Sequence, residues 1–206
     1  MITLYHFPSP NGRKALIALE EFGLPYRVER VDVMIGEQFK PEFLAINPLG
    51  KVPALIDAED GAPAQRVFGS GAILLYLAEK TGRLMPTDPV QRAEALSWLE
   101  LAISDLSPAA MNLFRFFARA PEKLPYAIDL FKCELGRCWK AFNGRLADHP
   151  YLAGDDFSIA DIAAFPFAAA KAKSAPGYFM EFPDLLRWHD RINDRPAVQR
   201  AMAWDA

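Results

Sequence analysis

The chain has 206 residues, of which 51% are hydrophobic and 24% are charged, and its formal net charge is −3. This apolar share supports a packed core and excludes a wholly disordered chain. The near balance of 23 basic and 26 acidic residues predicts no surface for nucleic acid or an anionic membrane.

Short apolar runs alternate with helix-like segments over residues 1–82. The predicted elements, in chain order, are a strand at Ile2–His6, a helix at Gly12–Phe22, a strand at Tyr26–Val31, a helix at Pro41–Ile46, strands at Ala54–Ile56 and Arg66–Phe68, and a helix at Ser70–Thr81. A crossover helix between the first two strands implies that they are parallel. The order βαβαββα therefore predicts an α/β domain with mixed strand pairing.

After a linker at residues 83–88, the pattern of residues 89–206 is purely helical. A long segment begins at Pro89 and runs toward Ala120, with a kink expected at Pro108. The Ser158 hydroxyl stands three residues before the Asp161 carboxylate, which is the spacing of a capping box that starts a helix. Further helices are expected from Pro125, Pro183 and Pro196. The sequence therefore predicts a second, all-helical domain.

The segment Phe7–Arg13, between the first strand and the first helix, is the first candidate for chemistry. A helix N-terminus presents unpaired N–H groups and a partial positive charge, so Ser9 and Asn11 would lie where an anion is stabilised. A thiolate held there would have a lowered pKa. The alternative is that Ser9 or Asn11 only caps the helix.

Two further segments have similar properties. Pro53 opens a strand after a turn, and a cis Val52–Pro53 bond would expose the Val52 backbone to an extended peptide ligand. At the next junction of strand and helix, the backbone and hydroxyl of Ser70 could bind a carboxylate. The alternatives are an ordinary strand start at Pro53 and an ordinary helix cap at Ser70.

The whole chain resembles the glutathione transferase family. The motifs that carry the resemblance are NPLGKVPALID (47–57), SGAILLYLAEKTG (70–82) and YLAGDDFSIADIAAFP (151–166). The resemblance implies an N-terminal thioredoxin-like domain, a C-terminal helical domain and a homodimer. The segments SPNGRKALIALEEFGLPY (9–26), GEQFKPEFLAINP (36–48) and APEKLPYAID (120–129) are most similar to the bacterial Nu-class and disulfide-bond oxidoreductase branch.

That branch implies glutathione-dependent disulfide reduction or peroxidase chemistry without a protein cysteine. Its catalytic motif corresponds to Ser9-Pro10-Asn11, with the Asn11 amide beside the glutathione sulfur. Phe7 stands where tyrosine-type transferases have their catalytic hydroxyl, so that subtype is disfavoured. The resemblance also implies glutathione contacts for Gln38, Lys51, Val52, Pro53, Gly69 and Ser70.

This chain differs from the family's pattern at two positions. Gly69 stands where most relatives have a carboxylate for the γ-glutamyl ammonium, a hydrogen bond worth roughly 1.5–3 kcal/mol. Asp105 is a candidate replacement for this carboxylate, across a dimer interface. The second position is Leu130, which stands where the oxidoreductase branch has an arginine.

Two alternative functions remain open. One is a transferase that conjugates glutathione to a small electrophile, with Ser9 as the thiolate donor. The other is a non-catalytic binding protein with the same fold.

The two cysteines, Cys133 and Cys138, have neither a metal-binding spacing nor a favourable spacing for a disulfide within one helix. No metal is therefore expected. The N-terminus begins directly with a strand-like run rather than a signal peptide. A cytoplasmic protein with reduced thiols is expected.

Overall fold

The computed structural model describes residues 1–58 and 63–204, so part of the segment between the strands predicted at Ala54–Ile56 and Arg66–Phe68 lies outside the described residues. The chain divides into two compact units, Met1–Arg83 together with Asn193–Ala206, and Leu84–Ile192. The C-terminal residues thus share a unit with the first 83. The domain limits expected from the sequence, 1–82 and 89–206 with a linker at 83–88, stay a prediction.

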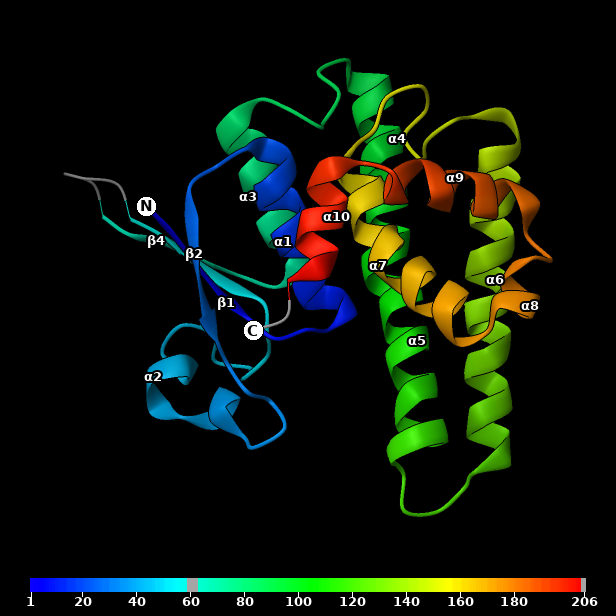
Figure 1. Ribbon diagram of the computed structural model, residues 1–206, viewed down its shortest axis with the longest axis horizontal. Coiled ribbons are helices and arrows are strands. Elements are labelled where there is room, and N and C mark those ends of the chain that lie inside the picture. The colour runs from blue at the N-terminus through cyan, green and yellow to red at the C-terminus, as the bar shows by residue number, and fades with distance from the viewer. Residues whose placement is uncertain (59–62, 205–206) are drawn as a thin grey trace. The chain divides into compact units, whose positions relative to one another are not determined.

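The first unit contains a four-stranded sheet in the order β2-β1-β3-β4 (Figure 1). The strands are β1 (Ile2–His6), β2 (Tyr26–Arg30), β3 (Ala54–Asp57) and β4 (Gln65–Phe68). β1 pairs with β2 in parallel, and β3 is antiparallel to both β1 and β4. The predicted mixed sheet and the parallel pairing of its first two strands are confirmed.

Helices cover both faces of this sheet. They are α1 (Pro10–Phe22), η1 (Glu37–Phe39), α2 (Pro41–Leu44) and α3 (Ser70–Thr81), while α10 (Pro196–Ala203) packs against α1. Because side chains alternate along a strand, Leu4 and Leu55 face α1 and α3, whereas Tyr5 and Ala54 face α2 and pack in one cluster with Phe43. Both faces of the central strands are therefore buried.

The boundaries of α1 follow from its caps. The helix begins two residues before the predicted start because the Ser9 hydroxyl caps it and Pro10 is tolerated at the first helical position. It ends at Gly23, which has the left-handed φ of 67° that a helix C-cap requires.

The second unit is entirely helical. Its elements are α4 (Pro89–Glu100), η2 (Leu101–Leu106), α5 (Ser107–Phe114), η3 (Arg115–Arg119), α6 (Pro125–Asp148), α7 (Ile159–Ser174), α8 (Pro176–Phe179) and α9 (Pro183–Asn193). The interruption expected at Pro108 takes the form of a π-helical turn, η2, directly before α5. Proline cannot donate the usual helical hydrogen bond, and the wider turn accommodates its ring.

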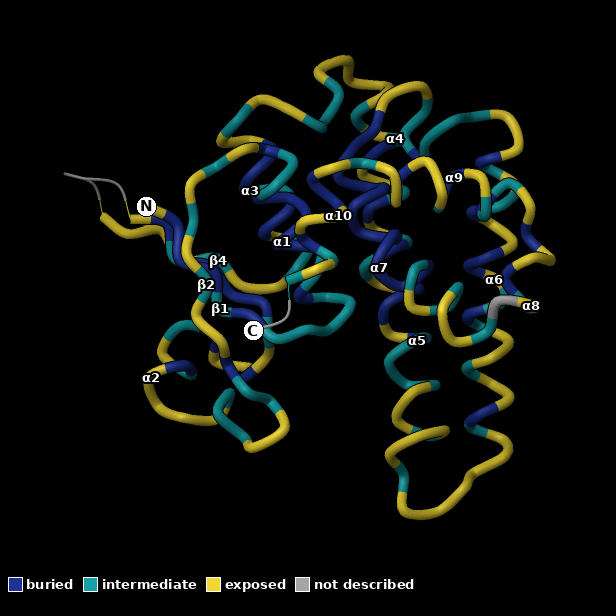
Figure 2. The backbone as a smooth tube through the Cα atoms, viewed as in Figure 1, coloured by how far each residue is buried: buried dark blue, intermediate teal, exposed yellow. Residues whose placement is uncertain are grey.

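Helix α7 forms the centre of the second unit, and every residue from Ile159 to Ala168 is buried (Figure 2). Its start is the predicted capping box, in which the Ser158 hydroxyl accepts a hydrogen bond from Ala160 N and the Asp161 carboxylate accepts one from Ser158 N. The predicted architecture of one α/β unit and one helical unit is thus confirmed. No helix in the described part of the chain is long and apolar enough to cross a membrane.

Candidate active site

The three segments singled out in the sequence lie at one edge of the sheet. β1 and β4 run in the same direction because each is antiparallel to β3, which lies between them. Both strands end at the edge where β3 begins, and Tyr5, Ala54 and Phe68 lie in one line across the sheet. The strand order therefore brings residues 7–11, 51–53 and 69–70 together.

Two helix N-termini also lie at this edge, because α1 follows β1 and α3 follows β4. Each presents N–H groups that have no partner within the helix, together with the positive end of the helix dipole. At α3 the N-cap residue is Gly69, which has no side chain to satisfy these groups. The edge is therefore suited to an anionic ligand.

The Ser9 hydroxyl is the N-cap of α1 and accepts a hydrogen bond of 3.2 Å from Gly12 N. Ser9 therefore caps α1, as its position before the helix indicates. The same hydroxyl retains a proton that it can donate outward, so capping does not prevent contact with an anion. Asn11 lies in the first turn of α1, and its side chain is half-buried.

The backbone before β3 has the shape expected for pairing with a peptide. The Val52–Pro53 bond is cis, which is one of the two alternatives that the sequence leaves open, and Asn47 Nδ2 fixes the preceding residue with a 2.6 Å bond to Lys51 O. The N–H and C=O of Val52 form no hydrogen bond with any residue that the structure describes. An extended ligand can therefore pair with Val52 as an additional strand would.

Gly69 and Ser70 lie beside this segment, since Gly69 N donates to Pro53 O over 3.3 Å. Gly69 has a φ of 87°, which a side chain would strain, although a Cβ atom there would contact nothing within 4 Å. Ser70 occupies the first position of α3 and is half-buried.

Gln38 lies close to the same segment. Its backbone carbonyl oxygen is 3.0 Å from the position that a Cβ atom on Gly50 would occupy, and Gly50 directly precedes Lys51. The side-chain Nε2 donates to Val33 O over 3.4 Å, while Oε1 is buried with no hydrogen-bond partner among the described residues. An acceptor in this state can take a hydrogen bond from a ligand.

Asp105 belongs to the other compact unit. It lies on η2, where its carboxylate is exposed and accepts a hydrogen bond of 3.1 Å from Ser104 Oγ. The structure thus brings eight of the nine predicted site residues into the first unit, and the role of Asp105 stays a prediction.

Two titratable side chains are buried behind the edge. His6 is fully buried at the end of β1, and burial lowers its pKa to about 4, so the imidazole is neutral at pH 7. Lys14 is fully buried in α1, and burial lowers its pKa to about 7. Residue type does not predict either burial, because histidine and lysine are polar and usually face solvent.

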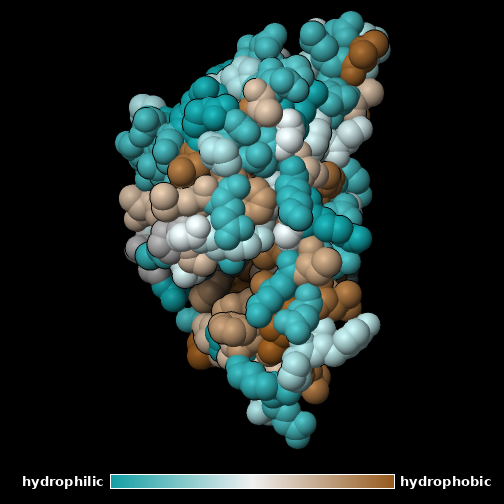
Figure 3. All heavy atoms as spheres, turned by 90° about the vertical axis from the view of Figure 1, so that its right-hand side faces the viewer, coloured by the Kyte–Doolittle hydropathy of each residue, from teal (hydrophilic) through white to brown (hydrophobic). Residues whose placement is uncertain are grey.

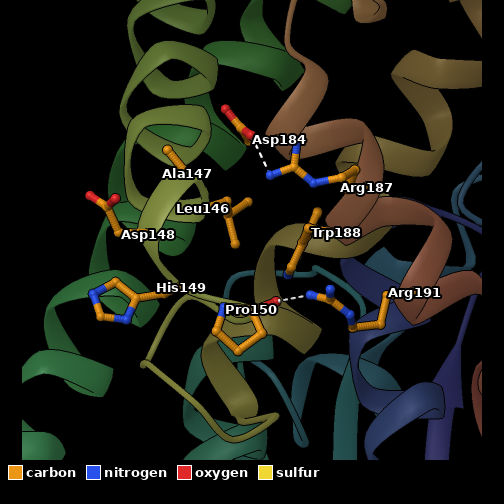
Figure 4. Close-up of a pocket in the computed structure, with 9 residues that line it drawn as sticks. All are labelled: Leu146, Ala147, Asp148, His149, Pro150, Asp184, Arg187, Trp188 and Arg191. Carbon is orange, nitrogen blue, oxygen red and sulfur yellow. Dashed lines mark hydrogen bonds and ion pairs between the residues drawn. The ribbon is translucent and has the colours of Figure 1, made fainter.

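A separate pocket of about 210 Å³ lies in the second unit, between the end of α6 and α9 (Figure 4). Its two arginines are held locally: Arg187 pairs with Asp184 at 2.5 Å, and Arg191 donates to Pro150 O over 2.6 Å. None of the predicted site residues lines this pocket. It is therefore not the candidate active site.

Two models of known protein families match this chain. The family models "Glutathione S-transferase, N-terminal domain" and "Glutathione S-transferase, C-terminal domain" match residues 8–80 and 106–196. The chain therefore belongs to the glutathione S-transferase family.

Individual relatives indicate the branch of the family to which the chain is similar. Disulfide-bond oxidoreductase YfcG of Escherichia coli is 42% identical over 204 residues, which cover 98% of this chain and 94% of that protein. A glutathione transferase YghU from Streptococcus pneumoniae, solved with glutathione, has a TM-score of 0.92 and 36% identity, covering 99% of this chain and 83% of that chain. A glutathione transferase from Pseudomonas putida, solved with one glutathione disulfide per subunit, has a TM-score of 0.90 and 33% identity, covering 100% of this chain and 92% of that chain. The predicted resemblance to the family and to its disulfide-bond oxidoreductase branch is confirmed.

Proposed function

We propose that the protein is a glutathione-dependent disulfide-bond reductase, with glutathione as co-substrate bound along the sheet edge of the first unit. The observation that carries the proposal is the Val52 backbone, which is unpaired within the described part of the chain and lies beside the N-termini of α1 and α3. These features match a short peptide with carboxylates and a thiolate. A relative named as a disulfide-bond oxidoreductase and a structure solved with glutathione disulfide support the same activity.

We propose the following roles for six of the predicted site residues. Val52 pairs with the peptide backbone of glutathione, Ser70 and the first turn of α3 hold the γ-glutamyl carboxylate, and exposed Lys51 neutralises the glycyl carboxylate. Pro53 holds the cis bond beside Val52. Ser9 and Asn11 stabilise the thiolate at the N-terminus of α1.

The reaction is thiol–disulfide exchange in two steps. The glutathione thiolate attacks one sulfur of the substrate disulfide, which forms a mixed disulfide and releases one substrate thiolate. A second glutathione thiolate attacks the mixed disulfide, which releases the other substrate thiolate and glutathione disulfide. Two glutathione thiols supply both the electrons and the two protons that the products take up.

A protein thiol is not needed for this scheme. Burial raises the pKa of Cys138 to about 11, so it is a thiol rather than a thiolate at pH 7. Both cysteines lie in the second unit and neither forms a disulfide within the described chain. The cytoplasmic location expected from the sequence stays a prediction.

A homodimer is part of the proposal. Five large apolar side chains near the end of the α5–α6 hairpin are between 40% and 81% exposed: Phe114, Phe117, Leu124, Tyr126 and Leu130. Hydrophobic residues gather over this end of the hairpin on the face that Figure 3 shows. An exposed group of this kind is typical of a protein–protein interface, and a second copy of the chain would cover it. The Asp105 carboxylate of that copy is the candidate replacement for the carboxylate that Gly69 lacks.

Replacement of Asn11 and Ser9 tests the proposal. Asn11→Ala should lower kcat/KM for disulfide reduction about 10- to 150-fold, as expected for loss of a hydrogen bond to a charged sulfur. Ser9→Ala should lower it less and should also destabilise α1 by about 1 kcal/mol through loss of the cap. Asn193→Ala, at an exposed position at the end of α9, is the control.

Three outcomes would count against the reductase assignment. A folded Asn11→Ala variant with full activity would exclude a catalytic role for the amide. A larger loss in Ser9→Ala, together with turnover of an electrophile, would favour the conjugating transferase. No turnover of either kind by the wild type would favour a binding protein.

A further inference from the structure

The last segment of the chain, residues 195–204, is fixed along α1 at the end distant from the sheet edge. Arg195 forms a two-bond ion pair with Glu21, at 2.6 and 2.8 Å, and Arg200 binds Glu20 at 2.7 Å. The Glu21 side chain is only 8% exposed, so this attachment is shielded from solvent. All of these residues belong to the first compact unit.

The same segment is fixed a second time at the start of α1. Arg13 Nη1 donates to Ala201 O over 2.6 Å and to Met202 O over 2.7 Å. These are among the last carbonyl groups of α10, which have no partner within that helix, and they form its negative end. Arg13 therefore acts as the C-terminal cap of α10.

A third contact follows directly after α10. The Trp204 ring packs edge-on against the buried His6 ring, with the centroids 4.7 Å apart and the planes at 88°. Neither nitrogen of His6 has a hydrogen-bond partner among the described residues. The position of this ring is therefore determined by packing.

Gly12 connects the His6 ring to the site loop. A Cβ at this position would stand 3.0 Å from two atoms of the His6 ring and 2.3 Å from Phe7 O. The loop thus lies directly against the ring, and a displacement of the ring would move the loop. Residues 7–12, which include Ser9 and Asn11, begin after His6 and end before Arg13, and both flanking residues contact the C-terminal segment.

From this arrangement we infer that residues 195–204 hold the loop of Ser9 and Asn11 in its reactive conformation, with Arg13 as the positioning residue. The catalytic meaning of the inference rests on the proposed function. Reacting groups need placement within about half an ångström, which a surface loop attains only when both of its ends are held.

The chain offers a matched control for Arg13. Arg83 also bridges two helix carbonyl groups, Phe22 O at 3.1 Å and Glu21 O at 3.2 Å, but it does so at the C-terminal end of α1. Phe22 is nine positions along the helix from Arg13, or about 13 Å at 1.5 Å per residue. Arg83→Gln therefore removes a comparable contact far from the loop.

The first test is amide hydrogen exchange without glutathione. The amides of residues 12 and 13 donate to Ser9 Oγ and Ser9 O, so they report directly on the loop. Exchange at both amides should be at least about tenfold faster in Arg13→Gln and unchanged in Arg83→Gln, because a loop released at one end opens more often. Arg13→Lys, which keeps one charged donor, should recover part of the protection.

The second test separates positioning from binding. In disulfide reduction, Arg13→Gln should lower kcat at least about tenfold with a smaller change in KM for glutathione, and Arg83→Gln should retain both constants. Trp204→Leu should accelerate exchange at the same two amides, and it replaces Arg13→Gln if that variant does not fold. Equal exchange in the Arg13 and Arg83 variants would overturn the inference. An inactive wild type whose exchange follows the expected pattern would instead refute the proposed function and leave the positioning of the loop established.

Discussion

Replacing Asp161 with asparagine should lower the free energy of unfolding of the helical unit by about 2–4 kcal/mol. The carboxylate is fully buried and accepts four hydrogen bonds. Oδ1 accepts from Leu152 N at 2.9 Å and Trp188 Nε1 at 2.8 Å, and Oδ2 accepts from Ser158 N at 2.9 Å and Ser158 Oγ at 3.1 Å. One side chain thus joins the start of α7 to the preceding loop and to α9.

The magnitude follows from which donors an amide can satisfy. An asparagine oxygen can replace Oδ1, but its NH2 group then faces Ser158, whose hydroxyl can turn to accept whereas its backbone N–H cannot. One buried donor is left unsatisfied, at about 1–3 kcal/mol, and the two remaining bonds lose their charge, at roughly 1 kcal/mol together. Asp161→Ala would leave three buried N–H donors unsatisfied, besides the rotatable Ser158 hydroxyl, and the three alone cost about 3–9 kcal/mol, which is comparable to the whole stability of a domain.

Urea unfolding and thermal unfolding of Asp161→Asn measure the effect. At 2–4 °C per kcal/mol for a chain of this size, Tm should fall by about 4–16 °C. Asp156→Asn, at an exposed position two residues before the cap, is the control and should change stability by less than about 0.5 kcal/mol. Equal stability of the two variants would show that the four hydrogen bonds of Asp161 do not stabilise the helical unit.

The two buried basic groups predict how stability depends on pH. The pKa of folded His6, about 4, lies below its usual value of 6.5, so its contribution is complete above pH 6.5 and is lost as the pH falls to about 4, roughly 3 kcal/mol in all. His6→Phe should flatten this part of the curve in urea titrations, and an unchanged slope would contradict the burial argument. The pKa of folded Lys14, about 7 rather than 10.5, makes its contribution complete above pH 10.5 and lost as the pH falls to 7. Lys14→Met should therefore remove the part of the pH dependence of stability that lies between pH 7 and pH 10.5, and an unchanged slope there would contradict the burial argument.

Much of the fold could be predicted from local patterns. The Ser158–Asp161 spacing, the left-handed glycine at Gly23 and the prolines at helix starts each determine backbone geometry within a few residues. The cis bond at Val52–Pro53 could be considered from the sequence, because the preference for the trans form is much weaker in a bond that precedes proline.

Predicting the candidate site requires both local sequence patterns and contacts between residues that are far apart in the chain. The helix starts at Ser9 and Ser70 could be read from the sequence, but their proximity follows from the antiparallel position of β3 between two strands of the same direction. The contact of Arg13 with Ala201 joins residues 188 positions apart and leaves no local pattern. The packing of α10 within the first unit leaves no local pattern either, since its own helical period does not indicate which surface it covers.

Binding of glutathione is the central claim, and calorimetric titration with reduced and oxidised glutathione measures it most directly. S-methylglutathione, which keeps the peptide backbone but has no thiol, serves as the control ligand. We expect saturable binding of both natural forms to one site per subunit, with heat that depends on the thiolate for the reduced form only. No binding of either form up to ~10 mM, which corresponds to a binding free energy weaker than about −2.7 kcal/mol, would refute glutathione as the co-substrate.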